Sequence, residues 1–181
     1  MKTPIVVTAY RGVEYQEALH AIKRQQYLRD ERRCFADGIQ AKAVFGSGVY
    51  LVSNQQVAAE YAYCHAESSW DQAAILEQRL ELRRPKVLDS RYGENELRDE
   101  ALYWKYSKEE MDTVASILQP QDWLRWSGEQ IREYLIERGY DSILFHLRSD
   151  LLYYVSYEPA NQISNIRLLH RFAISRLENT R

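Results

Sequence analysis

Two tyrosines, Tyr50 and Tyr61, have the residue type and spacing to hold a flat ligand between their rings. Tyr50 lies in the apolar stretch 49–52, whose β-branched and aromatic side chains are typical of a buried strand. Gly46 and Gly48 precede this stretch, and glycines permit a tight turn and a close approach of a ligand to the backbone. The sequence therefore predicts a turn and a strand that present Tyr50.

A helix is expected directly after this strand. Ser53 or Asn54 is its candidate N-cap, because both side chains can accept a hydrogen bond from the first helical N–H groups. The apolar residues that follow recur at helical spacing, which puts Tyr61 on the inner face, where it can fold back towards Tyr50. Two rings in that relation can clamp a heterocycle. An ordinary α/β core also contains such a unit, so this segment alone leaves both interpretations open.

The segment 46–62, GSGVYLVSNQQVAAEYA, resembles the second motif of the ADP-ribosyltransferase superfamily. In that family a Gly-x-Gly-x-Tyr segment and a helix ending in a second tyrosine cradle the nicotinamide of NAD, and the spacing of the two tyrosines agrees. The resemblance implies that Tyr50 stacks on nicotinamide and that Tyr61 closes the other side. It also implies that Gly48 lines the cofactor site and that Ser53 donates a hydrogen bond there.

The segment 9–12, Ala-Tyr-Arg-Gly, resembles the strand end that carries Arg or His in the same superfamily. The resemblance implies that the backbone of Gly12 binds the nicotinamide carboxamide and that Arg11 binds the ribose or a phosphate. Arginine offers a rigid fork of hydrogen-bond donors for such a task. The alternative for Arg11 is an ordinary surface ion pair.

A third motif, residues 137–145 leading to 153–163, resembles the ending of phage and bacterial members, including toxin-like proteins. In this alignment Tyr153 occupies the position of the family's catalytic glutamate. A carboxylate is useful there because cleavage of the bond from ribose to nicotinamide builds oxocarbenium character, and the acid fixes the ribose hydroxyls and activates the nucleophile. Asp150 and Glu158 are alternative carboxylates, and Tyr153 itself is a candidate to position a ribose hydroxyl.

The resemblance implies an NAD-dependent mono-ADP-ribosyltransferase that releases nicotinamide and modifies a protein or nucleic-acid acceptor. Its catalytic residues would be Arg11, Tyr50 and Tyr153, and NAD would be the co-substrate. The mixed charge run 29–33 favours a solvated helix end or loop, and its functional alternative is a basic rim that contacts the acceptor. A neutralising partner protein is also expected of a toxin-like member. The absent glutamate favours an alternative, a degenerate fold that binds NAD, ADP-ribose or a partner without turnover. The related RNA 2′-phosphotransferase is disfavoured because no histidine lies in the Arg11 motif.

Composition predicts one domain over residues 1–181, large enough to bury a core without metals or disulfides. The net charge of −2 gives no global reason to expect a nucleic acid or an anionic membrane as partner. Cys34 and Cys64 form no CxxC pair, which indicates a reducing compartment and no zinc site. The N-terminus has no signal-peptide pattern, so we expect a cytoplasmic protein, with delivery into a host or target cell as the toxin-like alternative.

Strands are predicted near both ends of the chain and helices in the middle, which favours an α+β fold. The resemblance specifies this fold as a split β-sheet core with flanking helices. Capping boxes predict helices that begin at Ser107 and Ser127, with Pro120 ending the first and Gly139 the second. The first strand is expected to end at Arg11 and Gly12, before a helix with Ala18, Leu19, Ile22 and Tyr27 on its inner face. The predicted strands are 5–10, 49–52, 76–82, 87–88, 142–145, 151–157 and 165–172, and the predicted helices are 14–28, 53–66, 107–119 and 127–138.

Overall fold

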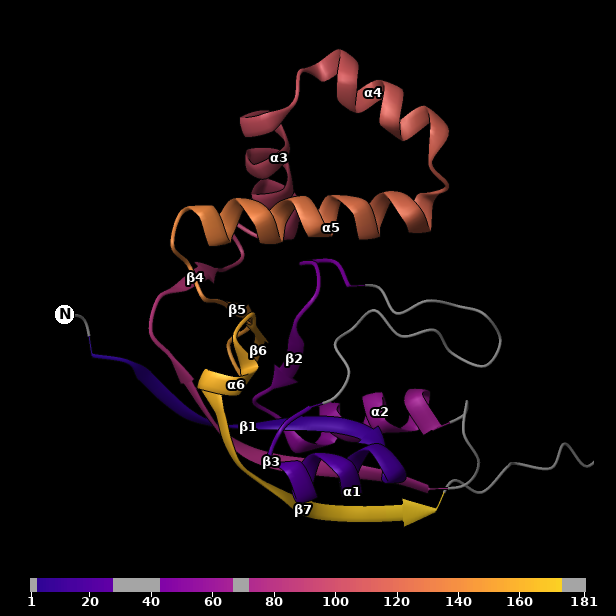
Figure 1. The fold of residues 1–181 in the computed structure, drawn as a ribbon, viewed down its shortest axis with the longest axis vertical. Helices are drawn as coiled ribbons and strands as arrows, with labels where there is room; N and C mark the ends of the chain where they lie inside the picture. The colour runs from indigo at the N-terminus through magenta and orange to yellow at the C-terminus, as the bar shows by residue number, and fades with distance from the viewer. Residues whose placement is uncertain (1–2, 28–42, 67–71, 174–181) are drawn as a thin grey trace, which may run out of the picture.

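The computed structural model describes residues 3–27, 43–66 and 72–173, and no side chain of 63–66 is described. This part of the chain forms a seven-stranded mixed sheet and six helices, an arrangement compatible with the predicted α+β class (Figure 1). In chain order the elements are β1 (Ile5–Glu14), α1 (Tyr15–Arg24), β2 (Val49–Val52), α2 (Gln55–Ala66), β3 (Gln72–Leu82), β4 (Pro85–Leu88), α3 (Glu94–Lys105), α4 (Lys108–Ile117), α5 (Pro120–Glu137), β5 (Ser142–Arg148), β6 (Leu151–Ser156), α6 (Pro159–Gln162) and β7 (Ile163–Ala173).

The strands lie in the order β4-β5-β6-β2-β1-β3-β7, and only the β4–β5 pair is parallel. β1 pairs with β3 over its whole length, from Ile5 to Glu14. On its other side, β1 pairs with β2 at one position among the described residues, Tyr10 opposite Val52. The sheet therefore opens between β1 and β2 beyond Tyr10.

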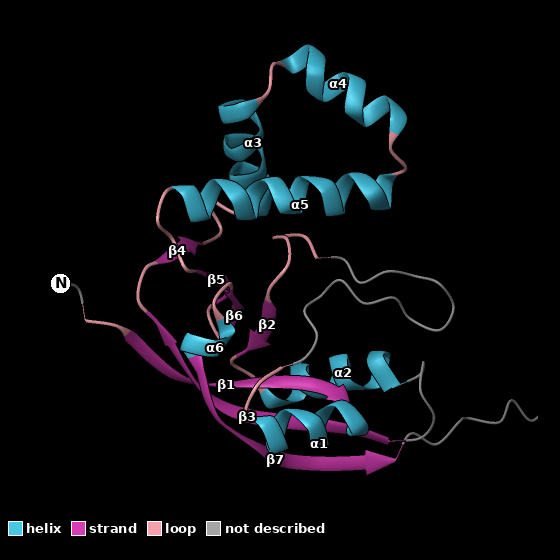
Figure 2. Cartoon of the chain, in the orientation of Figure 1, coloured by secondary structure: helices cyan, strands magenta, loops and turns pink. Residues whose placement is uncertain are grey.

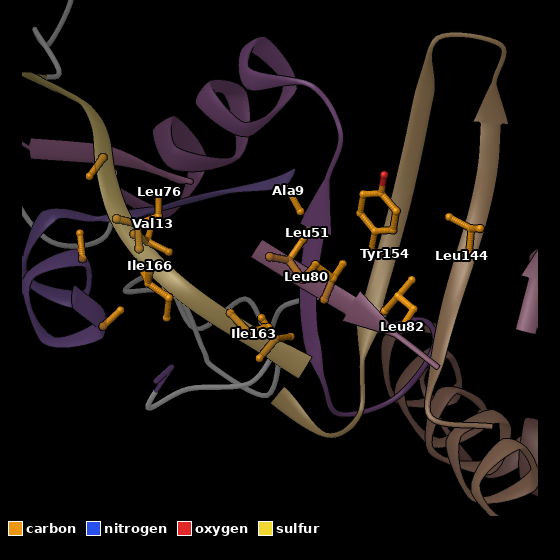
Figure 3. Close-up of a cluster of buried hydrophobic side chains, with 14 residues drawn as sticks. Ala9, Val13, Leu51, Leu76, Leu80, Leu82, Leu144, Tyr154, Ile163 and Ile166 are labelled. Atoms are coloured by element: carbon orange, nitrogen blue, oxygen red, sulfur yellow. The ribbon is translucent and has the colours of Figure 1, made fainter. Parts of the chain in front are cut away.

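Helices cover both faces of the sheet (Figure 2). α1 packs on one face, where Ala9 and Val13 of β1 join a cluster of buried side chains (Figure 3). α2 and α5 pack on the opposite face. This follows from β6, where Tyr153 packs beside α2 and Val155 packs beside α5, because residues two apart in a strand point to the same side.

The prediction that Arg11 and Gly12 end the first strand is wrong, since β1 continues to Glu14. Gly12 instead lets α2 approach the strand. A Cβ on Gly12 would lie 1.9 Å from the Ala58 carbonyl oxygen and 2.4 Å from the Ala62 nitrogen, both in the backbone of α2. α2 therefore packs so closely on β1 that position 12 has room for the hydrogen atom of glycine but not for a Cβ.

The first helix is shorter than predicted, and one of its predicted inner residues is on the surface. Ala18 is fully buried, whereas Leu19 is 42% exposed. Gln25 ends α1 with a left-handed backbone conformation, φ 53°. Its carboxamide accepts a hydrogen bond from the Ile166 N–H and donates one to the Ile166 carbonyl, at 2.8 and 2.9 Å. The end of α1 is thereby fixed to β7 where that strand departs from regular pairing with β3.

The helical segment between β4 and β5 differs from the prediction in two ways. The capping box of Ser107 with Glu110 is confirmed, but α3 precedes it and was not predicted. The start predicted at Ser127 is wrong, because α5 begins at Pro120 and Ser127 is buried inside it, accepting a hydrogen bond from Arg98 at 3.0 Å. Proline is tolerated at the first helical position, where its missing N–H costs no hydrogen bond. Gly139 follows α5 with φ 79°, as predicted.

We predict that Gly12→Ser lowers the free energy of unfolding by about 3 kcal/mol, because the new side chain forces α2 away from β1. Urea denaturation followed by circular dichroism measures this. Gly93→Ser is the matched control, since the nearest atom to its added Cβ is 3.5 Å away and serine suits a helix N-cap. Equal stability of the two variants would contradict the close packing of α2 on Gly12.

Candidate functional site

Three of the predicted site residues, Tyr50, Tyr61 and Tyr153, lie on one face of the sheet. Tyr50 lies opposite Val155, and Val52 lies opposite Tyr153, so Tyr50 and Tyr153 are diagonal neighbours on the face that α2 and α5 cover. Tyr61 reaches the same face from α2. Its hydroxyl lies 2.8 Å from the Tyr153 hydroxyl, and the two rings meet edge to face with centroids 6.2 Å apart. Tyr61 remains 42% exposed.

The hydroxyl of Tyr50 holds the turn that precedes its own strand. It donates a hydrogen bond to the Gly46 carbonyl at 2.7 Å and accepts one from the Phe45 N–H at 3.0 Å. Gly46 has φ 81°, a conformation that favours glycine. Gly48 allows the turn to lie against β6, since a Cβ there would be 2.9 Å from the Ser156 carbonyl oxygen. The two glycines thus shape the turn, as their spacing predicted.

The structure distinguishes the two candidate N-caps of α2, Ser53 and Asn54. Asn54 caps α2, because its side-chain oxygen accepts hydrogen bonds from the N–H groups of Gln56 and Val57 at 2.8 and 3.1 Å. Ser53 exchanges backbone and side-chain hydrogen bonds with Leu152: its N–H donates to the Leu152 carbonyl, and its hydroxyl accepts from the Leu152 N–H. Ser53 therefore extends the pairing of β2 with β6.

Arg11 lies on the opposite face of the sheet, beside α1, and only 3% of it is exposed. Its guanidinium donates a hydrogen bond to the Tyr50 carbonyl at 2.8 Å, across the opening between β1 and β2. The same group lies 4.0 Å from the Glu17 carboxylate and 4.9 Å from the centre of the Tyr27 ring. Through these contacts Arg11 joins the two halves of the sheet. It does so on the side opposite the tyrosine face, which is the face that carries Tyr50, Tyr61 and Tyr153.

A buried polar network surrounds Arg11. Burial raises the pKa of Tyr27 well above its ordinary value, against the opposing effect of the Arg11 charge. The Tyr27 hydroxyl donates to the side-chain oxygen of Gln78, and the Gln78 amide donates to the Ala9 carbonyl at 2.7 Å. Gln78 is 1% exposed. These hydrogen bonds satisfy polar groups that would be costly to bury alone.

The two carboxylates considered as substitutes for the family's glutamate lie at opposite ends of β6. Asp150 is in the turn before β6, 74% exposed, and its carboxylate is 3.6 Å from Arg148. Glu158 follows the strand and is exposed at the start of α6. The side chain that occupies the expected position of the acid is the phenol of Tyr153, and its hydroxyl contacts Tyr61.

Glu129 of α5 is a carboxylate at this site that sequence reasoning missed. It accepts hydrogen bonds from both the N–H and the hydroxyl of Ser47, the first at 2.8 Å. The backbone of Gly128 also approaches the turn so closely that a Cβ on Gly46 would lie 2.7 Å from its oxygen. Because 82 positions separate Ser47 from Glu129, no local pattern connects the two.

The charged run 29–33 and Cys34 lie outside the described residues. In the part of the chain that the structure describes, no group of three or more histidine, cysteine, aspartate or glutamate side chains is placed to hold a metal ion. Within the same part, no helix has the length and apolar character needed to cross a membrane.

The sequence matches no model of a protein family, and no match is found among curated proteins. The resemblance to ADP-ribosyltransferases therefore depends on the three sequence motifs.

We predict that Arg11→Ala lowers the free energy of unfolding by about 3 kcal/mol, because it removes the buried guanidinium that bonds the Tyr50 carbonyl across the opening of the sheet and lies beside the Glu17 carboxylate. Chemical denaturation measures the loss. Arg148→Ala is the control, since that side chain is 64% exposed and a surface ion pair contributes less than about 1 kcal/mol. If Arg11→Ala were as stable as the control, Arg11 would not hold β1 and β2 together.

Proposed function

We propose that this chain binds NAD on the face of the sheet that carries Tyr50, Tyr61 and Tyr153, as a protein of the ADP-ribosyltransferase type. The observation that carries the proposal is the contact between Tyr61 and Tyr153, with hydroxyls 2.8 Å apart, beside Tyr50 on the neighbouring strand. Aromatic rings stack on flat heterocycles, and phenol hydroxyls can bond the polar edge of a ligand. Three such groups from separate elements suit a nicotinamide riboside.

The opening between β1 and β2 supports this proposal, because a split sheet is what the resemblance implies. Beyond Tyr10, the residues 11–14 of β1 have no β2 partner in the described chain. A carboxamide bound at that edge would meet the backbone of β1 near Gly12, the role that the resemblance gives to Gly12. Arg11 is buried on the other face, so we assign it a positioning role through Tyr50 in place of a direct contact with ribose or phosphate.

Binding without efficient turnover is the form of the proposal that the geometry favours. Tyr153 is a phenol where the reaction calls for a carboxylate, and its hydroxyl is engaged with Tyr61. Loss of one positioned electrostatic group of this kind lowers a rate by roughly two to three orders of magnitude. In this form of the proposal, the protein binds NAD or ADP-ribose without efficient turnover.

Slow transfer of ADP-ribose to a protein or nucleic-acid acceptor is the second candidate function. The observation that favours it is that the position of the missing acid is still polar, since Tyr153 presents a hydroxyl and is only half-buried. That hydroxyl is suited to orient a ribose hydroxyl while an acceptor attacks the anomeric carbon and nicotinamide leaves. A neutralising partner would then limit the activity.

We predict that Tyr61→Ala weakens binding of NAD about tenfold, because it removes a stacking ring and the hydroxyl partner of Tyr153. Isothermal titration calorimetry with NAD and with ADP-ribose measures the effect. Tyr103→Ala is the matched control, since that tyrosine is 60% exposed on α3 and should leave NAD binding unchanged. Equal affinities of the two variants, or no heat of NAD binding by the native chain, would refute the proposed site.

We predict that Tyr153→Glu raises the rate of nicotinamide release from NAD by roughly two orders of magnitude, because it restores a carboxylate beside the ribose. Chromatographic detection of free nicotinamide measures the rate, and Tyr153→Gln is the control with the same shape and no charge. A native chain that already releases nicotinamide as fast as the Tyr153→Glu variant would favour the transferase over the binding module.

A further inference from the structure

Arg132 of α5 is an arginine of low exposure whose guanidinium has no hydrogen-bond acceptor. In the described chain, the arginines that are not exposed are Arg11, Arg98, Arg125 and Arg132. The first three each bond an oxygen atom. Arg132 forms no hydrogen bond or ion pair with any residue that the structure describes, and its Nε atom is buried without a partner. A buried donor of this kind is uncommon in folded proteins and calls for an acceptor.

The side chain of Arg132 lies where α5 meets the turn before Tyr50. α3, α4 and α5 form a helical layer, and α5 is its member nearest to β2 (Figure 1). A Cβ on Gly46 would lie 2.8 Å from the Cβ of Arg132, so the helix and the turn are in close contact. The Gly46 carbonyl in turn accepts the hydrogen bond of the Tyr50 hydroxyl. One residue of the turn therefore separates Arg132 from Tyr50.

The ring of Tyr157 supports the guanidinium. Its centroid lies 5.9 Å from the Cζ atom of Arg132. The Tyr157 hydroxyl donates to the Phe45 carbonyl at 2.8 Å, which fixes the ring. Burial raises the pKa of Tyr157 well above its ordinary value, against the opposing effect of the Arg132 charge. The phenol therefore stays neutral and leaves the charge of Arg132 uncompensated.

Two acidic residues of α5 neighbour Arg132 in sequence, and both are engaged with other groups. Glu129, one helical turn earlier, accepts hydrogen bonds from the N–H and the hydroxyl of Ser47. Glu133, the next residue, pairs with Lys105 at 3.0 Å. Within the described chain, neither carboxylate forms an ion pair with Arg132. Because Arg132 is only partly buried, an anion from solvent can reach it.

We propose that Arg132 binds the pyrophosphate of NAD while the nicotinamide riboside lies on the tyrosine face, an inference that rests on the proposed function. A guanidinium offers paired donors that match the geometry of phosphate oxygens, and such charge-assisted hydrogen bonds are among the strong ones. The pyrophosphate would supply the acceptor that the buried Nε lacks.

The spacing along the chain suits a dinucleotide. Tyr153 and Tyr157 are four residues apart, so their side chains leave the extended chain on the same side. Four residues of a strand span about 13 Å. One ribose separates the nicotinamide of NAD from its first phosphate, so a ligand that begins at Tyr153 extends towards Arg132. Gly46 adds no side chain at this point of the turn.

The test compares ligands with and without phosphate by isothermal titration calorimetry on the full chain. Arg132→Gln should weaken binding of NAD and of ADP-ribose about tenfold and leave nicotinamide riboside, which has no phosphate, unchanged. Arg132→Lys keeps the charge but loses the paired donors, so it should weaken binding of NAD several-fold. Arg125→Gln is the matched control, since it makes the same change of charge on α5 in a side chain that pairs with Asp122, and it should alter no affinity.

The possible results separate this inference from the proposed function. A native chain that binds NAD, together with Arg132 variants that bind it equally well, would overturn the role of Arg132 alone. No binding of NAD or nicotinamide riboside by the native chain would refute the proposed function and this inference with it. Equal weakening of NAD and nicotinamide riboside by Arg132→Gln would show that Arg132 only supports the turn before Tyr50. Unchanged binding of NAD with weakened binding of a single-stranded oligonucleotide would assign Arg132 to the phosphates of an acceptor.

Discussion

The hydrogen bond from the Arg11 guanidinium to the Tyr50 carbonyl is the contact on which the rest of this structure depends. β1 and β2 share one paired position among the described residues, Tyr10 with Val52, so regular pairing joins the two halves of the sheet only weakly. A buried cation bridges the opening instead. Glu17 compensates its charge, as a buried guanidinium requires. The strand that carries Tyr50 is therefore positioned by a residue on the other face of the sheet.

This arrangement separates the polar interior from the ligand-binding face that we propose. Behind the sheet, α1 covers Arg11 and its network. On the opposite face, α2 packs directly on Gly12. This close packing brings Tyr61 of α2 within hydrogen-bond distance of the Tyr153 hydroxyl. α5 completes this side by holding the Gly46–Gly48 turn through Glu129. The tyrosine face is thus built from elements that are distant in sequence but fixed to each other by backbone packing.

The helical layer adds a surface with a different chemistry. Its acidic side chains lie on α3, α4 and α5 and its exposed aromatic rings lie on α3, while the tyrosine face lies on β2, β6 and α2. α5 belongs to both, because one side packs on the sheet and the other supports α3. The helical layer is therefore joined through α5 to the turn before Tyr50.

Local patterns in the sequence determined the turn and strand around Tyr50, the helix that carries Tyr61, and the capping box at Ser107, because each depends on residues a few positions apart. The end of β1 was mispredicted because Gly12 serves contact with a helix about fifty positions later, and such contacts leave no periodic signal. The start of α5 was mispredicted because Ser127 is suited to cap a helix yet is satisfied inside one by Arg98. Only the tertiary structure placed Arg11 behind the sheet, paired Tyr61 with Tyr153 and brought Glu129 to the turn. Side-chain direction and long-range contact are decided by packing, which is a property of the whole fold.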